Sequence, residues 1–248
     1  MNRLLYRRFF GIAIMFGTVS CGNSNNPSIE TKDSTTTAVT PVASELVEPH
    51  GYLVANYSIQ DKNVFQQYID SSVSIIAQYN GKVILHDEST HTLEGSPKKV
   101  IDITEFPSVA AAEKFYHSSE YAAAKELRRL STKGGWVLLA SSPATTTLNK
   151  PHGYQVVNYT INDTATFHKY MDGAGPLAPK FGGTVPIFDL NAKALEGNPG
   201  KVFGVAEFAG LADADRFYHS PEYTAAKRFR IASTENGITI LASSVPLQ

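Results

Sequence analysis

The sequence predicts an α+β protein built from two tandem ferredoxin-like modules, each with the element order βαββαβ. The first observation behind this prediction is a repeated segment: residues 115–125 read FYHSSEYAAAK, and residues 217–227 read FYHSPEYTAAK. The second is that the similarity runs without a gap at a constant offset of 102 residues, which marks an internal duplication. The third is that strand-like and helix-like patterns alternate within each copy. We therefore expect modules at residues 49–142 and 151–245, joined by a linker at residues 143–150.

The first half of each module should form a strand and then a helix. Residues 52–59 alternate in polarity and are rich in β-forming side chains, so they predict a strand. Asp61 and Asp163 are suitable N-caps for the helices that follow. Asn80-Gly81 and Gly182-Gly183 should end these helices, because glycine readily adopts the left-handed conformation found at helix C-termini.

The middle of each module should contain two further strands. In the first copy these strands are residues 82–85 and 99–106, and Leu93-Glu94-Gly95 is expected to close a hairpin between them. In the second copy Pro186 interrupts the equivalent of the first of these strands. Proline cannot donate a ladder hydrogen bond, so this strand should lie at a sheet edge or carry a bulge.

The last part of each module should be a broken helix and a final strand. In the first copy the helix covers residues 109–117 and 119–130, and the strand covers residues 136–141. Ser118 and Ser220 should restart the helix as N-caps. The expected buried stripe of the second helical segment follows helical spacing. It consists of Ala123, Leu127 and Leu130, with Ala225, Phe229 and Ala232 in the second copy.

The first strand of each module is apolar on both faces, with Leu53 and Ala55 on one side and Tyr52 and Val54 on the other. Helices in a two-layer module cover only one sheet face, so something must bury the other face. The second copy is the simplest partner. We expect the two sheets to pack face to face as a single-chain pseudo-dimeric α/β barrel, and the chain to be a monomer with internal pseudo-two-fold pairing.

The N-terminus predicts export. Residues 1–8 are basic, and the apolar run at residues 9–19 is shorter than the about 20 residues that span a bilayer. Cys21, the only cysteine, follows directly. This arrangement resembles the bacterial lipoprotein signal, which implies a signal peptide at residues 1–20 and lipid, including palmitate, on Cys21. An ordinary secreted protein and an uncleaved anchor are the alternatives.

The expected location is the bacterial cell envelope, with a lipid anchor and most simply the outer membrane, since Gly22 resembles the outer-membrane sorting pattern. Residues 21–48 then form a flexible tether, because they contain too few apolar side chains to pack a core. Without the first twenty residues the chain has a net charge of −4. A mildly acidic protein without a basic run is a poor nucleic-acid binder, so no nucleic-acid partner is expected.

Both copies contain the same ordered set of motifs: Gly-Tyr-x-x-x-Asn-Tyr, Phe-x-x-Tyr, Leu-Glu-Gly, Glu-Phe and Phe-Tyr-x-Ser-x-Glu-Tyr. This set resembles the family called domain of unknown function 1330, which belongs to the dimeric α/β-barrel superfamily. The resemblance implies barrel-like pairing of two modules but no particular reaction. Superfamily relatives include cofactor-free monooxygenases, isomerases and haem enzymes, and fold alone does not carry function.

Glu105 and Glu207 are the candidate catalytic residues. Each ends a strand on the same face as two apolar side chains, and burying a carboxylate there raises its pKa toward the range of a general acid or base. Alternatively, each carboxylate reaches solvent at the strand end, or pairs with a basic helix residue to stabilise the fold.

A second set of side chains could bind a ligand, although a structural role is open for each. The asparagines lie on strands, where this residue is unusual, and the tyrosines could be core aromatics with a hydroxyl near the rim. The arginines lie beside tyrosine and lysine on one helix face, which is either a solvated flank or an anion-binding strip. The set comprises Asn56, Tyr68, Tyr116, Tyr121 and Arg128, with Asn158, Tyr170, Tyr218, Tyr223 and Arg230 in the second copy.

The sequence contains no zinc-spaced Cys/His set, phosphate-binding loop, nucleophile elbow or dinucleotide fingerprint. No metal and no cofactor are therefore expected. Three functions stay open. The first is an envelope lipoprotein that binds a small organic ligand in the cleft between sheet and helices. The second is a cofactor-independent enzyme, monooxygenase- or isomerase-like, that uses Glu105 or Glu207. The third is a structural or interaction protein without a ligand.

Overall fold

The computed structural model describes residues 48–143 and 152–243. The expected signal peptide, Cys21, most of the tether and nearly all of the linker lie outside these residues. The described residues belong to one compact unit. Among the described residues, no helix is both long enough and apolar enough to cross a membrane.

The first module has the expected βαββαβ order with one additional short strand, β3. Its elements are β1 His50–Ile59, α1 Lys62–Gln78, β2 Lys82–Asp87, β3 His91–Glu94, β4 Val100–Phe106, α2 Val109–Tyr116, α3 Ser119–Ser131 and β5 Thr132–Ser142. The predicted break in the second helix falls between α2 and α3. Ser118 caps α3, because its hydroxyl accepts a hydrogen bond from the backbone N–H of Tyr121.

The second module repeats this order and adds a short helix, α5, after the first long one. Its elements are β6 Gly153–Ile161, α4 Thr164–Ala174, α5 Leu177–Lys180, β7 Thr184–Asp189, β8 Lys193–Glu196, β9 Val202–Phe208, α6 Leu211–His219, α7 Pro221–Ser233 and β10 Thr234–Ser243. The strand with Pro186 lies at a sheet edge, and its register shifts between Thr184 and Ile187. Both features agree with the position of the proline.

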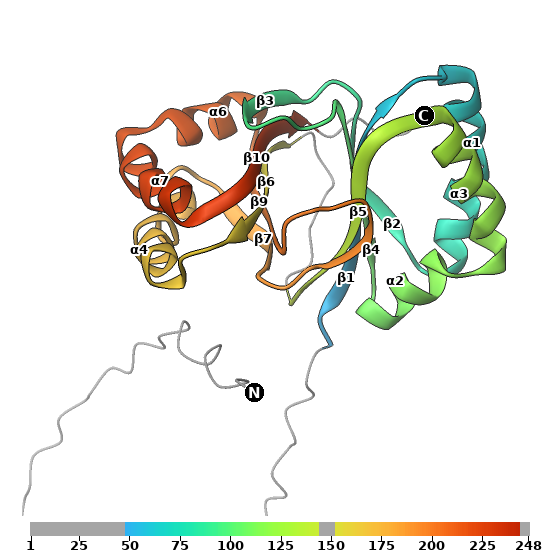
Figure 1. Ribbon diagram of the computed structural model, residues 1–248, viewed down its shortest axis with the longest axis horizontal. Coiled ribbons are helices and arrows are strands. Elements are labelled where there is room, and N and C mark those ends of the chain that lie inside the picture. The colour runs from blue at the N-terminus through green and yellow to red at the C-terminus, as the bar shows by residue number, and fades with distance from the viewer. Residues whose placement is uncertain (1–47, 144–151, 244–248) are drawn as a thin grey trace, which may run out of the picture. The chain divides into compact units, whose positions relative to one another are not determined.

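Each sheet has five antiparallel strands, and the fifth strand comes from the other module. The strand orders are β2-β4-β1-β5-β8 and β3-β10-β6-β9-β7. Figure 1 shows β3 beside β10, far along the chain. The prediction that Leu93-Glu94-Gly95 closes a hairpin was wrong, because residues 91–94 leave their own sheet and extend the partner sheet. A local pattern cannot reveal such an exchange.

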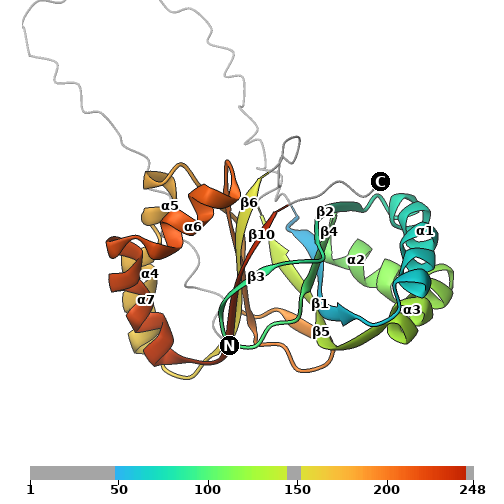
Figure 2. The same ribbon diagram turned by 90° about the horizontal axis from the view of Figure 1, so that it is seen from above.

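The two sheets face each other, and the helices cover their outer faces (Figures 1 and 2). The space between the sheets is filled by buried side chains from both modules, including Tyr52 and Ile101 from the first and Tyr154 and Phe203 from the second. Separate cores lie between each sheet and its helices. Face-to-face packing of the modules is thus confirmed.

The buried face of α3 differs from the predicted stripe. Tyr121, Ala124 and Arg128 are buried, whereas Leu130 is 66% exposed. In α7 the equivalents Tyr223, Ala226 and Arg230 are buried in the same way. The reason is non-local: each arginine is paired with a glutamate from the strand that the other module contributes.

Candidate functional site

The two exchanged strands place one glutamate each against the helices of the other module. Arg128 Nη2 lies 2.6 Å from Glu196 Oε1, and the Tyr116 hydroxyl donates to the same oxygen at 2.5 Å. Burial raises the pKa of Glu196, but the hydrogen bonds and charge of Arg128 and the hydrogen bond from Tyr116 outweigh it, so the net shift is downward. The carboxylate therefore stays ionised and holds the exchanged strand to α3.

The second module contains the same arrangement with the roles of the modules reversed. Arg230 Nη2 lies 2.7 Å from Glu94 Oε1, and the Tyr218 hydroxyl donates to this oxygen at 2.6 Å. The predicted ligand residues Arg128, Tyr116, Arg230 and Tyr218 therefore already bind protein carboxylates. We assign these four residues primarily to joining the modules.

The candidate acids Glu105 and Glu207 also have partners. Glu105 Oε1 accepts a hydrogen bond from the Tyr52 hydroxyl at 3.0 Å and lies 3.0 Å from His50 Nδ1. Glu207 Oε1 has the same neighbours, with the Tyr154 hydroxyl at 3.3 Å and His152 Nδ1 at 3.2 Å. Each carboxylate thus has among its partners a histidine and a tyrosine from the start of the adjacent strand or just before it.

Asn56 and Asn158 hold the backbone. The Asn56 side-chain amide donates to the carbonyls of Lys98 and Val100, and its oxygen accepts from the Lys98 N–H at 2.9 Å. Asn158 makes the same three contacts with Gly200 and Val202. Both ends of each amide bind backbone groups, so these residues shape the turn that precedes β4 or β9.

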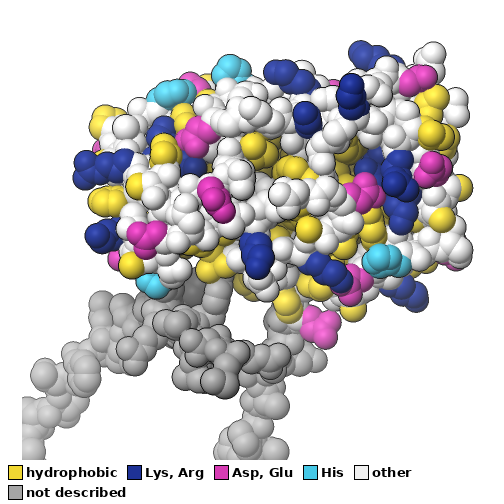
Figure 3. All heavy atoms as spheres, in the orientation of Figure 1, with side chains coloured by type: hydrophobic (Ala, Val, Ile, Leu, Met, Phe, Trp, Pro, Cys, Tyr) yellow, Lys and Arg dark blue, Asp and Glu magenta, His cyan; other side chains and the backbone are white. Residues whose placement is uncertain are grey.

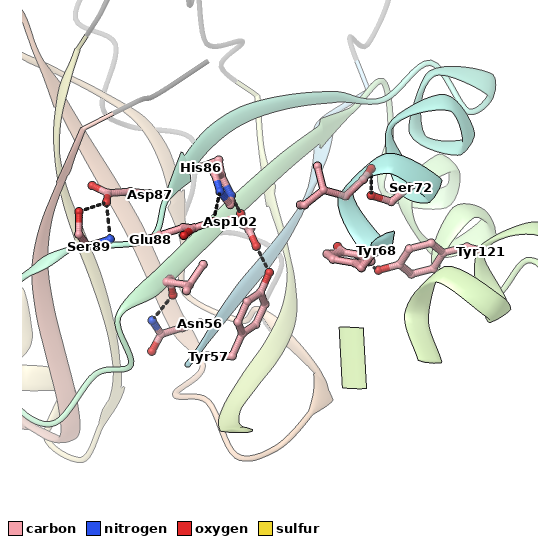
Figure 4. Close-up of polar contacts among 12 residues, drawn as sticks. Asn56, Tyr57, Tyr68, Ser72, His86, Asp87, Glu88, Ser89, Asp102 and Tyr121 are labelled. Atoms are coloured by element: carbon pink, nitrogen blue, oxygen red, sulfur yellow. Dashed lines mark hydrogen bonds and ion pairs between the residues drawn. The ribbon is translucent and has the colours of Figure 1, made fainter. Parts of the chain in front are cut away.

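The remaining predicted residues lie between the sheet and the helices of each module. The hydroxyls of Tyr68 and Tyr121 are 3.5 Å apart, and those of Tyr170 and Tyr223 are 3.4 Å apart. Figure 4 shows the first pair where α1 meets α3. The structure thus brings these four tyrosines to the two sheet–helix clefts, which differ strongly from each other.

The cleft of the first module contains a buried polar network that sequence reasoning missed. His86 on β2 and Asp102 on β4 are cross-strand neighbours, and His86 Nδ1 is in hydrogen-bond contact with Asp102 Oδ1. The Tyr57 hydroxyl donates to the other oxygen of Asp102 (Figure 4). Burial lowers the pKa of His86, but the hydrogen bond and charge of Asp102, with a smaller contribution from Glu88, raise it above its ordinary value.

The cleft of the second module is apolar and hollow at the equivalent place. Phe188 and Gly204 stand at the positions of His86 and Asp102 and are again cross-strand neighbours. A cavity of about 240 Å³ opens there. Its lining is largely apolar and is drawn from Gln155, Val157, Tyr170, Met171, Ala174, Gly175, Ala178, Val185, Phe188, Gly204, Val205, Ala206, Phe217 and Tyr223.

Two linked polar contacts lie in the wall of this cavity. Gln155 Nε2 donates to the Tyr223 hydroxyl at 3.0 Å, and Tyr223 in turn meets Tyr170. The equivalent of Gln155 in the first module is Leu53. Tyr170 and Tyr223, both predicted ligand residues, therefore lie at a cavity, whereas Glu105 and Glu207 line neither this cavity nor a smaller polar one beside Arg128 and Trp136.

The described residues contain no group of three or more His, Cys, Asp or Glu side chains that could hold a metal ion. The signal that could have revealed the two clefts is present in the sequence. Two positions that face each other across neighbouring strands change together between the copies, from His86 and Asp102 to Phe188 and Gly204. Cross-strand neighbours interact directly, so a joint change indicates a rebuilt site.

Solved structures with the same fold include an anthrone oxidase-like protein, with a TM-score of 0.53 and 12% identity over 79% of this chain and 92% of that one. Another is a mutant chlorite dismutase from Candidatus Nitrospira defluvii in complex with cyanide, with a TM-score of 0.51 and 12% identity over 79% of this chain and 91% of that one. At such identities the likeness shows the fold alone.

A search of curated proteins found no significant match. The family model for domain of unknown function 1330 matches twice, at residues 50–141 and 152–243. These two matches coincide with the two modules and cover most of the chain. The chain therefore belongs to the domain of unknown function 1330 family and carries two tandem copies of its domain with the dimeric α/β-barrel fold.

Proposed function

We propose that the protein binds a small, largely apolar organic molecule in the sheet–helix cleft of the second module. The observation that carries this proposal is the cavity of about 240 Å³ beside Gly204 and Phe188. Binding sites are typically concave and apolar, with a few polar groups that fix orientation. Gln155, Tyr170 and Tyr223 supply such groups here.

The volume of the cavity limits the size of the ligand. An apolar cavity of about 150 Å³ accepts benzene. The cleft of the second module is larger than this but small for a binding pocket, which typically measures roughly 300–1,000 Å³. A single substituted ring or a short branched chain would therefore fit.

Titration of the full-length protein with 4-fluorotoluene, followed by fluorine NMR, tests this proposal. We expect saturable binding that Ala206→Ile weakens about tenfold or more, because added side-chain volume in a packed site costs about 1–3 kcal/mol. Ala206 lines the cavity. Thr104→Ile at the equivalent position of the first module is the matched control and should leave binding unchanged. Absence of saturable binding would favour the structural role without a ligand.

A second candidate function is cofactor-independent acid–base catalysis at Glu105 or Glu207. The observation in its favour is the contact of each carboxylate with a histidine and a tyrosine, seen in both modules. A histidine beside a carboxylate is a common general base. Oxygen uptake with anthrone as substrate, abolished by Glu105→Gln together with Glu207→Gln, would support an oxidase of this kind. No uptake by the wild-type protein would argue against it.

The proposal includes attachment of the protein to the bacterial cell envelope through lipid on Cys21, most simply at the outer membrane. It is supported by the basic start, the short apolar run and the single cysteine. Labelled palmitate should be incorporated into the wild-type protein and lost in Cys21→Ala. Equal labelling of both proteins would contradict the lipid anchor.

We also propose that the protein acts as a monomer and has no nucleic-acid partner. The internal pairing of two modules supports the first point, because it already buries the sheet faces that a one-module chain would bury by dimerisation. The surface charge supports the second: basic and acidic side chains are interspersed over the face shown in Figure 3. Light scattering of the purified protein would test the monomer.

A further inference from the structure

The two modules use the same tyrosine near the end of the first strand in different ways. In the first module the Tyr57 hydroxyl donates to the Asp102 carboxylate (Figure 4). The equivalent residue of the second module, Tyr159, is completely buried, and its hydroxyl makes no well-formed hydrogen bond among the described residues; only a weak interaction with Tyr170 remains. A buried hydroxyl without a partner destabilises the folded protein, so it signals a missing group.

The missing group is the carboxylate of Asp102. Tyr57 pairs in register with Val100, and Asp102 lies two residues further on the same sheet face. Tyr159 pairs with Val202, so Gly204 takes the place of Asp102. Gly204 also lines the cavity of the second module. By this equivalence we expect the Tyr159 hydroxyl to lie near the Gly204 side of the cleft, although Tyr159 itself is not among the residues that line the cavity.

A second unsatisfied donor lies beside the first. Arg230 is 1% exposed, and its Nε has no hydrogen-bond partner among the described residues, although its Nη2 binds Glu94. The guanidinium carbon is 5.6 Å from the centre of the Tyr159 ring. Burial raises the pKa of Tyr159 by more than the charge of Arg230 and the interaction with Tyr170 lower it, so this residue stays protonated and can donate.

The charge that balances the carboxylate also differs between the modules. In the first module Asp102 is paired with His86, whose pKa is raised. In the second module Phe188 replaces that histidine, so a carboxylate there would depend on Arg230 for its opposite charge. A buried carboxylate needs both a charge partner and hydrogen bonds, and Arg230 and Tyr159 can supply them.

We propose that the ligand of the second module is a small monocarboxylic acid. Its carboxylate takes the position that the Asp102 side chain has in the first module, accepts a hydrogen bond from Tyr159 and lies in the field of Arg230. Val157 and the Phe188 ring, which lie 3.0 and 3.1 Å from a Cβ placed on Gly204, must shift slightly to admit it. Its apolar body, an aromatic ring or a branched chain, fills the cavity beside Phe188 and Met171. This inference rests on the proposed function and adds the chemical class of the ligand.

A matched pair of probes, 4-fluorobenzoate and 4-fluorotoluene, tests the inference by fluorine NMR on the full-length protein. The wild-type protein should bind the benzoate about tenfold or more tightly than the toluene, because a hydrogen bond to a charged group contributes about 1.5–3 kcal/mol. Tyr159→Phe should remove this preference and leave toluene binding in place. Tyr57→Phe, the same change in the first module, is the control and should retain the preference.

The possible outcomes separate this inference from the proposed function. If the toluene binds as tightly as the benzoate or more tightly, the carboxylate is wrong and the cavity proposal stands. If both probes fail to bind, both proposals are wrong. If Tyr159→Phe leaves the preference for the benzoate unchanged, the assignment of Tyr159 as the donor is overturned.

Discussion

The sheet–helix clefts of the two modules are built from the same elements but contain different side chains, polar in the first module and apolar in the second. Both lie between a sheet and two long helices, and both contain a tyrosine pair, Tyr68 with Tyr121 and Tyr170 with Tyr223. The first cleft holds a histidine–aspartate–tyrosine network, whereas the second is hollow and lined by apolar side chains. The residues that join the modules match in both copies, while those that fill the clefts differ. Duplication thus preserved the pairing and allowed one cleft to change.

The largest effect should come from breaking an ion pair that holds the two modules together. Glu94→Ala leaves Arg230 buried without its charge partner, and removal of one partner of a buried ion pair costs about 3–5 kcal/mol. We expect the unfolding free energy, measured with urea and circular dichroism, to fall by about 3 kcal/mol or more.

Glu196→Ala is the matched variant on the other side. Glu196 is more exposed than Glu94, and Arg128 is more exposed than Arg230, so its loss should cost less. Losses below about 1 kcal/mol in both variants would show that the two pairs are only surface ion pairs.

Exchange of the cleft contents between the modules should have the next largest effect. Phe188→His with Gly204→Asp should place the polar network in the second module and reduce binding of 4-fluorobenzoate about tenfold or more. A Cβ at position 204 would lie 3.0 Å from Val157 Cγ2 and 3.1 Å from the Phe188 ring, so the smaller histidine relieves one of the two close contacts. Fluorine NMR measures the affinity. Unchanged binding would mean that the probe occupies another site.

The reciprocal change, His86→Phe with Asp102→Gly, should open the cleft of the first module. We expect a second bound molecule of 4-fluorotoluene, measured as the stoichiometry of saturation. A ratio that stays at one probe per chain would show that the contents of the two clefts are not determined by these two positions alone.

The polar network should make stability depend on pH. The folded-state pKa of His86 is raised above its ordinary value of 6.5, so its contribution to stability is fully present below about pH 6.5 and is lost as the pH rises through the folded-state value. The difference in unfolding free energy between the wild type and His86→Gln should therefore shrink from pH 6 toward higher pH. His168→Gln, on the exposed side of α4, is the control. A difference that grows with pH would contradict this assignment.

The smallest effect should come from the glutamate–tyrosine hydrogen bond that occurs once within each module. Glu105→Gln and Glu207→Gln each keep an oxygen that accepts the tyrosine hydroxyl, so each should cost less than about 1.5 kcal/mol, and the two losses should be similar. Urea denaturation of the single variants measures both. A much larger loss in one copy would reveal a second difference between the modules.

The sequence predicted the features that depend on local patterns. Strand alternation, serine caps and a proline at an edge all act within a few residues, and Ser118 and Pro186 lie where these rules place them. The face-to-face sheets could also be predicted, because Tyr52 and Val54 needed a second apolar partner.

The features that were missed depend on contacts distant in sequence. Arg128 was predicted to lie either on a solvated flank or in an anion-binding strip. Arginine is rarely buried, and the burial of Arg128 becomes favourable only through Glu196 from the other module. The exchange of β3 and β8 shows no local signal, since a short strand looks the same whichever sheet it joins. The cleft between sheet and helices was predicted, but its contents were not. His86 and Asp102 are 16 residues apart in the chain, and only the strand register shows that they are neighbours.

Methyl NMR of the protein labelled at methionine is the most direct test of the central claim that the second cleft binds the ligand. Met171 lines the cavity, and the chain has only two other methionines, both within the first twenty residues. We predict that 4-fluorobenzoate shifts the Met171 methyl signal in a saturable way with one molecule bound per chain. Saturable binding of the probe without a shift of Met171 would contradict the account.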